Sequence, residues 1–245
     1  QMVHLSTSTD EHLWTARTDN TGRAELWYKP HGDTLATTAA PLKITDSKNT
    51  VLTAKAVEFR SGINKYTYAT KCATSAKVNI AFVVDATGSM GDEINYLQAE
   101  LSDVIHRTKK KLPGVEVTMG SVFYRDFSDE YVVKNFDFTS KVPDVMEFVK
   151  KQYAMGGGDY PEALIEAYDA AINSMSWDEE ARTKLLFVVL DAPPHYSAEN
   201  LVKLQKLAEK AAEKGIRIVP VAASGIDKST EYLMRAMALE TNGTY

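Results

Sequence analysis

The stretch 78-VNIAFVVDATGSMGDEIN-95 decides the fold of the longer part of this chain. A nearly continuous apolar run stops at an acid, Asp85, and two hydroxyl side chains follow at alternate positions, Thr87 and Ser89. A short apolar run bounded by turn residues is typical of a strand that is buried on both faces. The stretch therefore predicts a buried strand that delivers a carboxylate and two hydroxyls to one turn.

Apolar strands alternate with amphipathic helices after residue 77. This pattern predicts an α/β fold, a doubly wound and mostly parallel Rossmann-like sheet with helices on both faces. Pro220 inside the last strand removes a ladder donor, so we expect a bulge or a missing neighbour there. The expected strands are 79–84, 115–124, 131–138, 184–190 and 216–222, and the expected helices are 91–112, 141–152, 160–175, 197–214 and 228–240. The second and third strands should form an antiparallel hairpin, because only 125–130 joins them.

Residues 1–75 show a different rhythm, with short alternating segments and frequent turn residues. They predict a small antiparallel β-sandwich ahead of the α/β domain at 76–245. Within it, 13–28 is expected to form a hairpin around the turn 19-DNTG-22. Further strands are expected at 42–45, 51–59 and 65–70. The ending 242-NGTY-245 indicates one more strand beyond the chain, so we expect the α/β domain to be truncated before its last strand.

Composition excludes several classes of protein. Apolar residues make up 44% and charged residues 25%, and no run approaches the roughly 18 apolar residues that a membrane span requires. The net charge of −5, with no basic stripe beyond the lysines at 109–111, argues against nucleic acid as a partner. The single cysteine, Cys72, rules out an internal disulfide and a thiolate cluster. Residues 1–12 lack the features of a signal peptide.

Three loops carry polar side chains to one edge of the predicted sheet. In doubly wound sheets, ligands bind beyond the carboxyl ends of the strands. The first strand ends at an acid followed by two hydroxyls, the strand 184–190 ends at another acid, and 155-MGGGDYPE-162 places a third acid after three glycines. The candidate ligands are Asp85, Thr87, Ser89, Asp159 and Asp191.

Three carboxylates at one edge repel one another unless a cation neutralises them. Oxygen donors without thiolate are the set that Mg²⁺ prefers, with Mn²⁺ or Ca²⁺ as alternatives. Simpler roles exist for single residues: a hydroxyl caps a helix, Asp159 caps the helix after Pro161, and Asp191 ends a strand. Capping accounts for one hydroxyl but not for two hydroxyls and three acids from three loops. We therefore predict a divalent-cation site.

Four further residues are candidates for a rim that contacts a ligand: Arg125, Asp126, Tyr160 and His195. Simpler roles are a loop salt bridge for Arg125 and Asp126, packing for Tyr160, and capping or surface exposure for His195. Only His195 offers a general acid or base. No second acid follows Asp85 by two residues and no glycine-rich Lys-Ser/Thr loop is present, so a hydrolase is the weaker hypothesis.

The segment Asp85-Ala86-Thr87-Gly88-Ser89 resembles the D-x-[ST]-x-S motif of the von Willebrand factor A (VWA) domain. Asp191 resembles the third-loop acid of that family, and Asp159 stands where many members have Thr. The resemblance covers residues 77–245 and implies a metal-ion-dependent adhesion site (MIDAS). It implies that Thr87 and Ser89 bind the ion directly, and that an acidic group of a protein or glycan ligand completes its coordination.

The segment 18-TDNTGRAELWY-28 resembles hairpins in immunoglobulin-like or carboxypeptidase-regulatory-like β-sandwiches of bacterial surface proteins. With the VWA resemblance, it implies an extracellular or cell-surface adhesion module that is not an enzyme. An intracellular scaffold that docks onto a larger ATPase complex is the alternative hypothesis.

Overall fold

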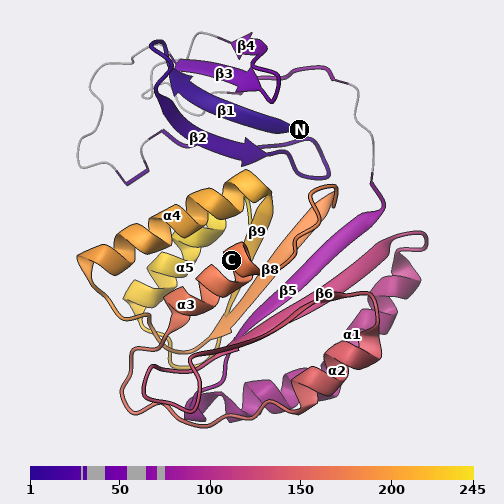
Figure 1. Cartoon of the computed structure of the whole chain (residues 1–245), viewed down its shortest axis with the longest axis vertical. Coiled ribbons are helices and arrows are strands. Elements are labelled where there is room, and N and C mark those ends of the chain that lie inside the picture. The colour runs from indigo at the N-terminus through magenta and orange to yellow at the C-terminus, as the bar shows by residue number, and fades with distance from the viewer. Residues whose placement is uncertain (29, 32–41, 54–64, 71–74) are drawn as a thin grey trace.

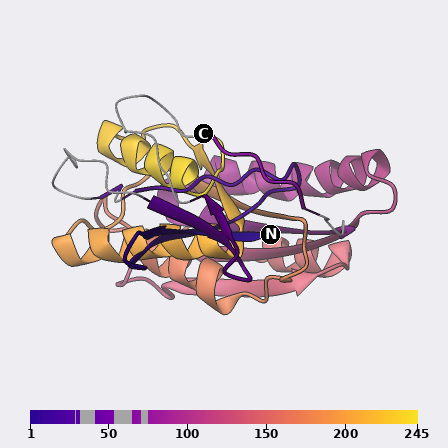
Figure 2. The same ribbon diagram turned by 90° about the horizontal axis from the view of Figure 1, so that it is seen from above.

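The computed structural model describes residues 1–28, 30–31, 42–53, 65–70 and 75–245. Its strands form two sheets, a four-stranded sheet of order β2-β1-β3-β4 and a five-stranded sheet of order β7-β6-β5-β8-β9 (Figure 1). The N-terminal strands lie at one end of the larger sheet (Figure 1), and they overlie the other elements when the molecule is seen from above (Figure 2). Cys72 and most of the predicted strand 51–59 lie outside the described residues.

The larger sheet is doubly wound, as the sequence predicts. β5 (Lys77–Asp85) pairs in parallel with β6 (Glu116–Tyr124) and β8 (Thr183–Leu190), and β8 pairs in parallel with β9 (Ile216–Ala222). β7 (Val133–Thr139) pairs antiparallel with β6, which confirms the predicted hairpin. Pro220 lies in β9, at the edge of the sheet among the described strands, where a missing donor breaks no ladder.

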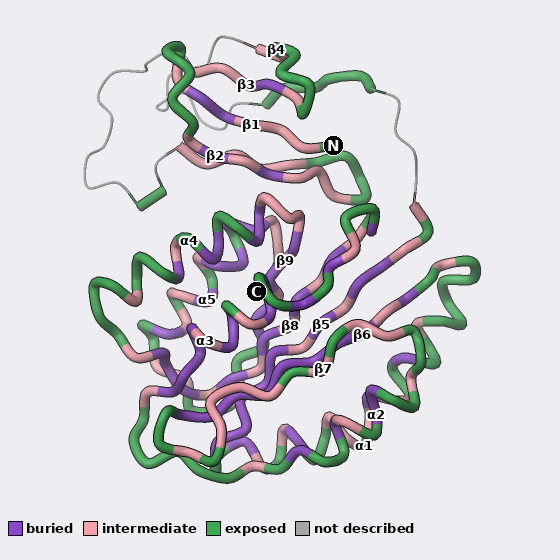
Figure 3. Tube along the Cα trace, in the orientation of Figure 1, coloured by how far each residue is buried: buried purple, intermediate pink, exposed green. Residues whose placement is uncertain are grey.

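Helices cover both faces of this sheet (Figure 1). α1 (Gly91–Lys111) and α2 (Val142–Lys150) pack on one face through apolar residues such as Ile94 and Val145. α3 (Leu164–Asp169) with its π-helical extension Ala170–Ser174, α4 (Ala198–Lys214) and α5 (Lys228–Glu240) pack on the other. The buried positions run along the strands between these layers (Figure 3). None of the described helices is long and apolar enough to cross a membrane.

The N-terminal β structure is confirmed as an antiparallel sheet, but its pairing differs from the prediction. β1 (Met2–Thr7) pairs with β2 (His12–Arg17) and β3 (Leu42–Asp46), and β3 pairs with β4 (Val51–Thr53). The predicted hairpin over 13–28 is wrong, because 23–28 forms no strand and β2 pairs with the residues before it. The predicted strand 65–70 is not found either, since these residues are exposed and none of them is part of a strand in the described part of the chain.

The N-terminal sheet packs against the second part of the chain through apolar and polar contacts. Trp14 and Leu5 share an apolar cluster with Ala212 of α4. Asp19 accepts a hydrogen bond from Arg217 Nη2 at 2.6 Å, at the start of β9. This interface therefore lies at the amino ends of the parallel strands.

Candidate functional site

Three loops meet at the carboxyl ends of the parallel strands, the edge of the sheet farthest from the N-terminal strands (Figure 1). We call them the first loop (86–90), the glycine loop (151–163) and the third loop (191–197). Two backbone hydrogen bonds join the first two: Gly88 N–H donates to Gly156 O at 3.1 Å, and Met155 N–H donates to Ala86 O at 3.0 Å. A further backbone bond ties the glycine loop to the third loop.

Asp85 is fully buried at the end of β5. Its Oδ1 accepts hydrogen bonds from the Thr87 N–H at 2.9 Å and from the Thr87 hydroxyl at 2.7 Å. Its Oδ2 is buried without a hydrogen-bond partner. Burial raises the pKa of Asp85 to about 6, and the charge of Asp191 also raises it, while the Thr87 donors and the Tyr124 hydroxyl oppose this shift. The site thus holds a carboxylate that has two hydrogen bonds on one oxygen, while the Tyr124 hydroxyl lies close enough to the carboxyl group to favour its charged form.

The other three predicted ligands differ in burial. Asp191 has a buried Oδ1 without a hydrogen-bond partner, so a second unsatisfied carboxylate oxygen lies near Asp85. Ser89 and Asp159 are exposed, and neither makes a hydrogen bond to the described part of the chain. The structure therefore joins Asp85, Thr87 and Asp191 closely and leaves Ser89 and Asp159 at the surface.

Sequence analysis missed Glu162, which is only 4% exposed. Its Oε2 is buried without a hydrogen-bond partner, and its N–H donates to Pro193 O at 2.8 Å. Burial, followed by the charges of Asp85 and Asp126, raises the pKa of Glu162 to about 9. The predicted helix 160–175 would have placed this residue in an exposed first turn. Because α3 begins only at Leu164, Glu162 instead lies on an extended segment that turns into the site.

Gly157 brings the glycine loop close to the first loop. It has a φ of +72°, which favours glycine. A Cβ at this position would lie 2.9 Å from Glu162 Oε1 and 3.2 Å from the Thr87 Cβ. The absent side chain thus lets Glu162 and Thr87 approach the same point.

The predicted rim divides into exposed and buried residues. Tyr160 is exposed and its hydroxyl donates to Gly225 O at 3.3 Å. His195 is partly exposed, and its Nε2 lies 2.6 Å from Asp126 Oδ1. Arg125 and Asp126 are buried, at 1% and 5% exposure, so they lie beneath the rim rather than on it.

The part of the chain that carries these loops matches a known family. The von Willebrand factor A domain family matches residues 79–244. The chain belongs to the VWA family. Domains of this family generally mediate protein–protein interactions, and residues 79–244 contain all three loops of the site.

Two larger proteins are similar to part of this chain. The chain is 32% identical over 123 residues to a putative ariadne-like RING finger protein of Acanthamoeba polyphaga mimivirus, which covers 50% of the chain and 12% of that protein. It is 29% identical over 161 residues to an alpha-protein kinase of Dictyostelium discoideum, covering 62% of the chain and 25% of the kinase. The chain therefore corresponds to a quarter or less of each relative's length.

The residues of this VWA domain fit a hard divalent cation. Buried oxygens of Asp85, Asp191 and Glu162 lack partners, and the Thr87 hydroxyl lies beside Asp85. Carboxylate and hydroxyl oxygens are suitable donors for Mg²⁺. In the described residues, no three His, Cys, Asp or Glu side chains are arranged as a cation site by themselves. A cation here would therefore depend on the hydroxyls as well as the acids.

Proposed function

We propose that this VWA domain is a cation-dependent binding module rather than an enzyme. Asp85, Thr87, Ser89 and Asp191 would hold a divalent cation, and Mg²⁺ suits these donors best. Glu162 would supply the glycine loop's carboxylate, the role that the sequence assigned to Asp159. The ligand would be a protein or glycan that offers an acidic group.

The observation that carries this proposal is the group of buried carboxylate oxygens without partners on three loops. A buried, unpaired acceptor costs about 1–3 kcal/mol, and more when it is charged, so a site that retains several favours a cation. When bound, the cation would neutralise these acids and offer an open coordination position to the ligand. Asp85 would keep Thr87 oriented through the two hydrogen bonds that it accepts.

The relatives support a recruiting role within a larger protein. Their names describe a kinase and a RING finger protein, and the chain spans only a small share of each. This favours the scaffold hypothesis as the setting in which the module binds its partner. A bacterial-surface location and the likeness of the N-terminal sheet to immunoglobulin-like domains stay predictions.

Calorimetric titration of Mg²⁺, Mn²⁺ and Ca²⁺ into chelator-treated protein tests the proposal. We expect saturable binding at one site, and its loss in Asp85→Ala. Glu162→Gln should weaken binding by about tenfold or more, because it removes a buried carboxylate beside the site. Asp159→Asn is the matched control, and its exposed carboxylate should matter less.

Absence of cation binding by the unaltered protein would contradict the proposal. A larger loss in Asp159→Asn than in Glu162→Gln would restore Asp159 as the ligand from the glycine loop. Circular dichroism of each variant should show that the fold is retained, so that lost binding reports on the site.

A further inference from the structure

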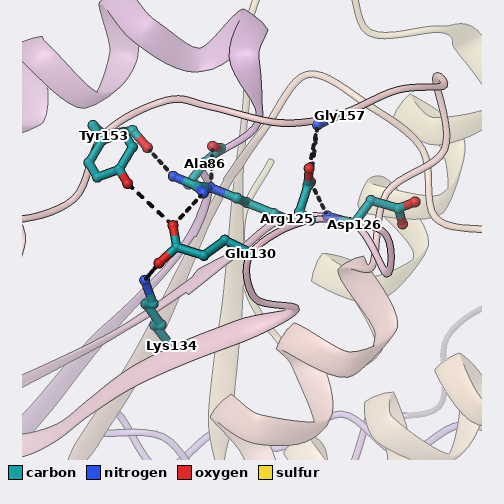
Figure 4. A network of polar contacts seen from close by, with 8 residues as sticks. Ala86, Arg125, Asp126, Glu130, Lys134, Tyr153 and Gly157 are labelled. Atoms are coloured by element: carbon teal, nitrogen blue, oxygen red, sulfur yellow. Dashed lines mark hydrogen bonds and ion pairs between the residues drawn. The ribbon is translucent and has the colours of Figure 1, made fainter.

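The segment 125–130, which makes up most of the loop between β6 and β7, contacts all three loops of the candidate site. It supplies none of the proposed ligands, yet two of its side chains are more than nine-tenths buried beneath the site. Figure 4 shows its contacts to Ala86 of the first loop and to Tyr153 and Gly157 of the glycine loop. We call this segment the β6–β7 loop.

Arg125 joins the first loop to the glycine loop. Its Nε donates to Ala86 O at 3.2 Å, and its Nη2 donates to Tyr153 O at 2.8 Å. The guanidinium carbon lies 4.5 Å from the ring centre of Tyr131 and 4.9 Å from that of Tyr153. Nη1 lies 3.5 Å from a carboxylate oxygen of Glu130, which offsets the buried charge. One side chain thus fixes two separate backbone segments at once.

The planar fork of an arginine is needed for this geometry. Its donors point in fixed, divergent directions, whereas a lysine ammonium is a single point on a flexible stem. A lysine at position 125 could keep the charge but could not bond two carbonyl groups of different loops with the same orientation. The contacts therefore depend on the shape of the side chain as well as its charge.

Two acids of the same loop make the remaining connections. Asp126 Oδ1 accepts a hydrogen bond from His195 Nε2 at 2.6 Å, which ties the β6–β7 loop to the third loop. Asp129 Oδ2 accepts from Gly157 N–H at 3.0 Å and from Asp126 N–H at 3.0 Å. Asp126 thus bonds the third loop, and Asp129 bonds both the glycine loop and the backbone of its own loop.

We propose that the β6–β7 loop is a frame that sets the spacing of the three site loops, with Arg125 and Asp126 as its positioning residues. Arg125 holds the first loop against the glycine loop, and Asp126 holds the third loop through His195. The part of this inference that concerns cation affinity rests on the proposed function. The part that concerns loop spacing does not.

The first test is Arg125→Lys, followed by amide hydrogen exchange of the chelated protein. The reporters are the amides of Gly88 and Met155, whose hydrogen bonds join the first loop to the glycine loop. We expect both amides to exchange at least about tenfold faster, while amides of β8 and β9 keep their rates. We also expect Mn²⁺ affinity to fall by about 10–100-fold, as for other residues that orient ligands.

Two controls separate this role from a general loss of stability. Arg217→Lys alters a partly buried arginine at the opposite edge of the sheet and should change neither amide nor affinity. Lys134→Ala removes a cation that contacts Glu130 and Tyr131 but no site loop, and it should also leave both unchanged. Matched unfolding curves would show how much stability each variant loses.

The second test does not require Arg125 to be replaced. Asp126→Ala removes the acceptor for His195, whereas Asp126→Asn keeps an oxygen in the same place without the charge. If Asp126 acts by position, Asp126→Asn should restore slow exchange of the Glu162 amide, which bonds the third loop at Pro193. Equal effects of the two substitutions would show that charge, and not position, matters.

Unchanged exchange at Gly88 and Met155 in a folded Arg125→Lys variant would overturn the proposal for the first two loops. An unchanged Glu162 amide in Asp126→Ala would overturn it for the third. If the unaltered protein binds no cation, the proposed function fails while both exchange experiments still decide the role of the frame.

Discussion

At the scale of single residues, Asp85 and Glu162 have the most unusual environments in the described site. Both are buried, and each has an oxygen without a hydrogen-bond partner. Burial favours the neutral form of a carboxyl group, and neighbouring acids act in the same direction. Without a cation, the site therefore retains protons that an exposed carboxyl group would have released.

This retention predicts a pH dependence for the cation-free protein. The pKa of Asp85 is raised from 3.8 to about 6, and that of Glu162 from 4.5 to about 9. Between these values the folded protein binds more protons than the unfolded chain, so the free energy of unfolding falls as pH rises. The contribution of these two residues should be most favourable below pH 4 and decline up to about pH 9.

Thermal unfolding of chelated protein between pH 5 and pH 9 measures this effect. The unfolding temperature should fall over the range, and Glu162→Gln should remove the part of the decline above pH 6. An identical decline in Glu162→Gln would show that other groups cause it.

The contrast between Asp159 and Glu162 shows what sequence reasoning could and could not find at this scale. The apolar run before Asp85 and the adjacent hydroxyls predict a carboxylate and a hydroxyl at the end of β5, and the structure places Asp85 and Thr87 together there. The burial of Glu162 was missed because it depends on where α3 begins. Glu162 is buried because the segment before α3 packs against the third loop. The spacing of apolar residues along the sequence does not reveal this contact.

At the scale of elements, the glycine loop has the strictest local requirements. Gly157 combines a positive φ with close approach to Glu162 and Thr87, whereas Gly158 has open space around its Cα. The two neighbours therefore offer a matched comparison within one loop.

Gly157→Ala should lower stability by about 1–2 kcal/mol, because a Cβ disfavours this backbone conformation. It should also weaken cation binding, since the new Cβ displaces Glu162. Gly158→Ala should change stability by less than about 0.5 kcal/mol. Gly114→Ala, with a φ of +80° and no neighbour within 4 Å, measures the backbone effect alone. Urea unfolding and cation titration of the three variants would check this, and equal affinity losses in all three would refute a specific role.

Sequence patterns predicted the elements of the larger sheet better than those of the N-terminal sheet. Residues 80–84 and 185–190 are apolar on both faces, so their burial follows from composition. In the N-terminal segment, 19-DNTG-22 does form a turn, with Asp19 bonding the amides of Thr21 and Arg23. The residues after the turn do not return along β2, although among the described strands β2 pairs with β1 alone and its other edge is open. Local turn chemistry could not show which strand would be the partner.

At the scale of the whole molecule, Asp19 links the two sheets. Its Oδ2 accepts hydrogen bonds from Arg217 Nη2 at 2.6 Å and from Asn242 Nδ2 at 3.4 Å. Its Oδ1 accepts a hydrogen bond from the Thr21 N–H within the turn. Asp46 makes the same kind of turn, with the amides of Lys48 and Thr50 bonded to its Oδ1. No ion pair to the larger sheet is described for Asp46, so replacing Asp46 measures how much such a turn alone contributes to stability.

Asp19→Ala should therefore lower the free energy of unfolding by about 1–2 kcal/mol more than Asp46→Ala, because it also leaves Arg217 without its carboxylate. Neither substitution should alter cation affinity, since the interface lies at the other edge of the sheet. Denaturant unfolding monitored by tryptophan fluorescence, together with cation titration, would measure both quantities. Equal losses of stability would mean that the Arg217 contact adds nothing between the two sheets.

The position of the N-terminal sheet also makes the two ends of the larger sheet different. It covers the amino ends of the parallel strands and leaves the opposite, loop-bearing edge clear (Figure 1). If the protein were immobilised on a solid surface through its first strands, its acidic loops would point away from that surface, because the larger sheet would lie between the two. Attachment through residues 2–17 should thus leave the loop-bearing face accessible, whereas attachment near Tyr160 would cover the face at which we propose that a partner binds.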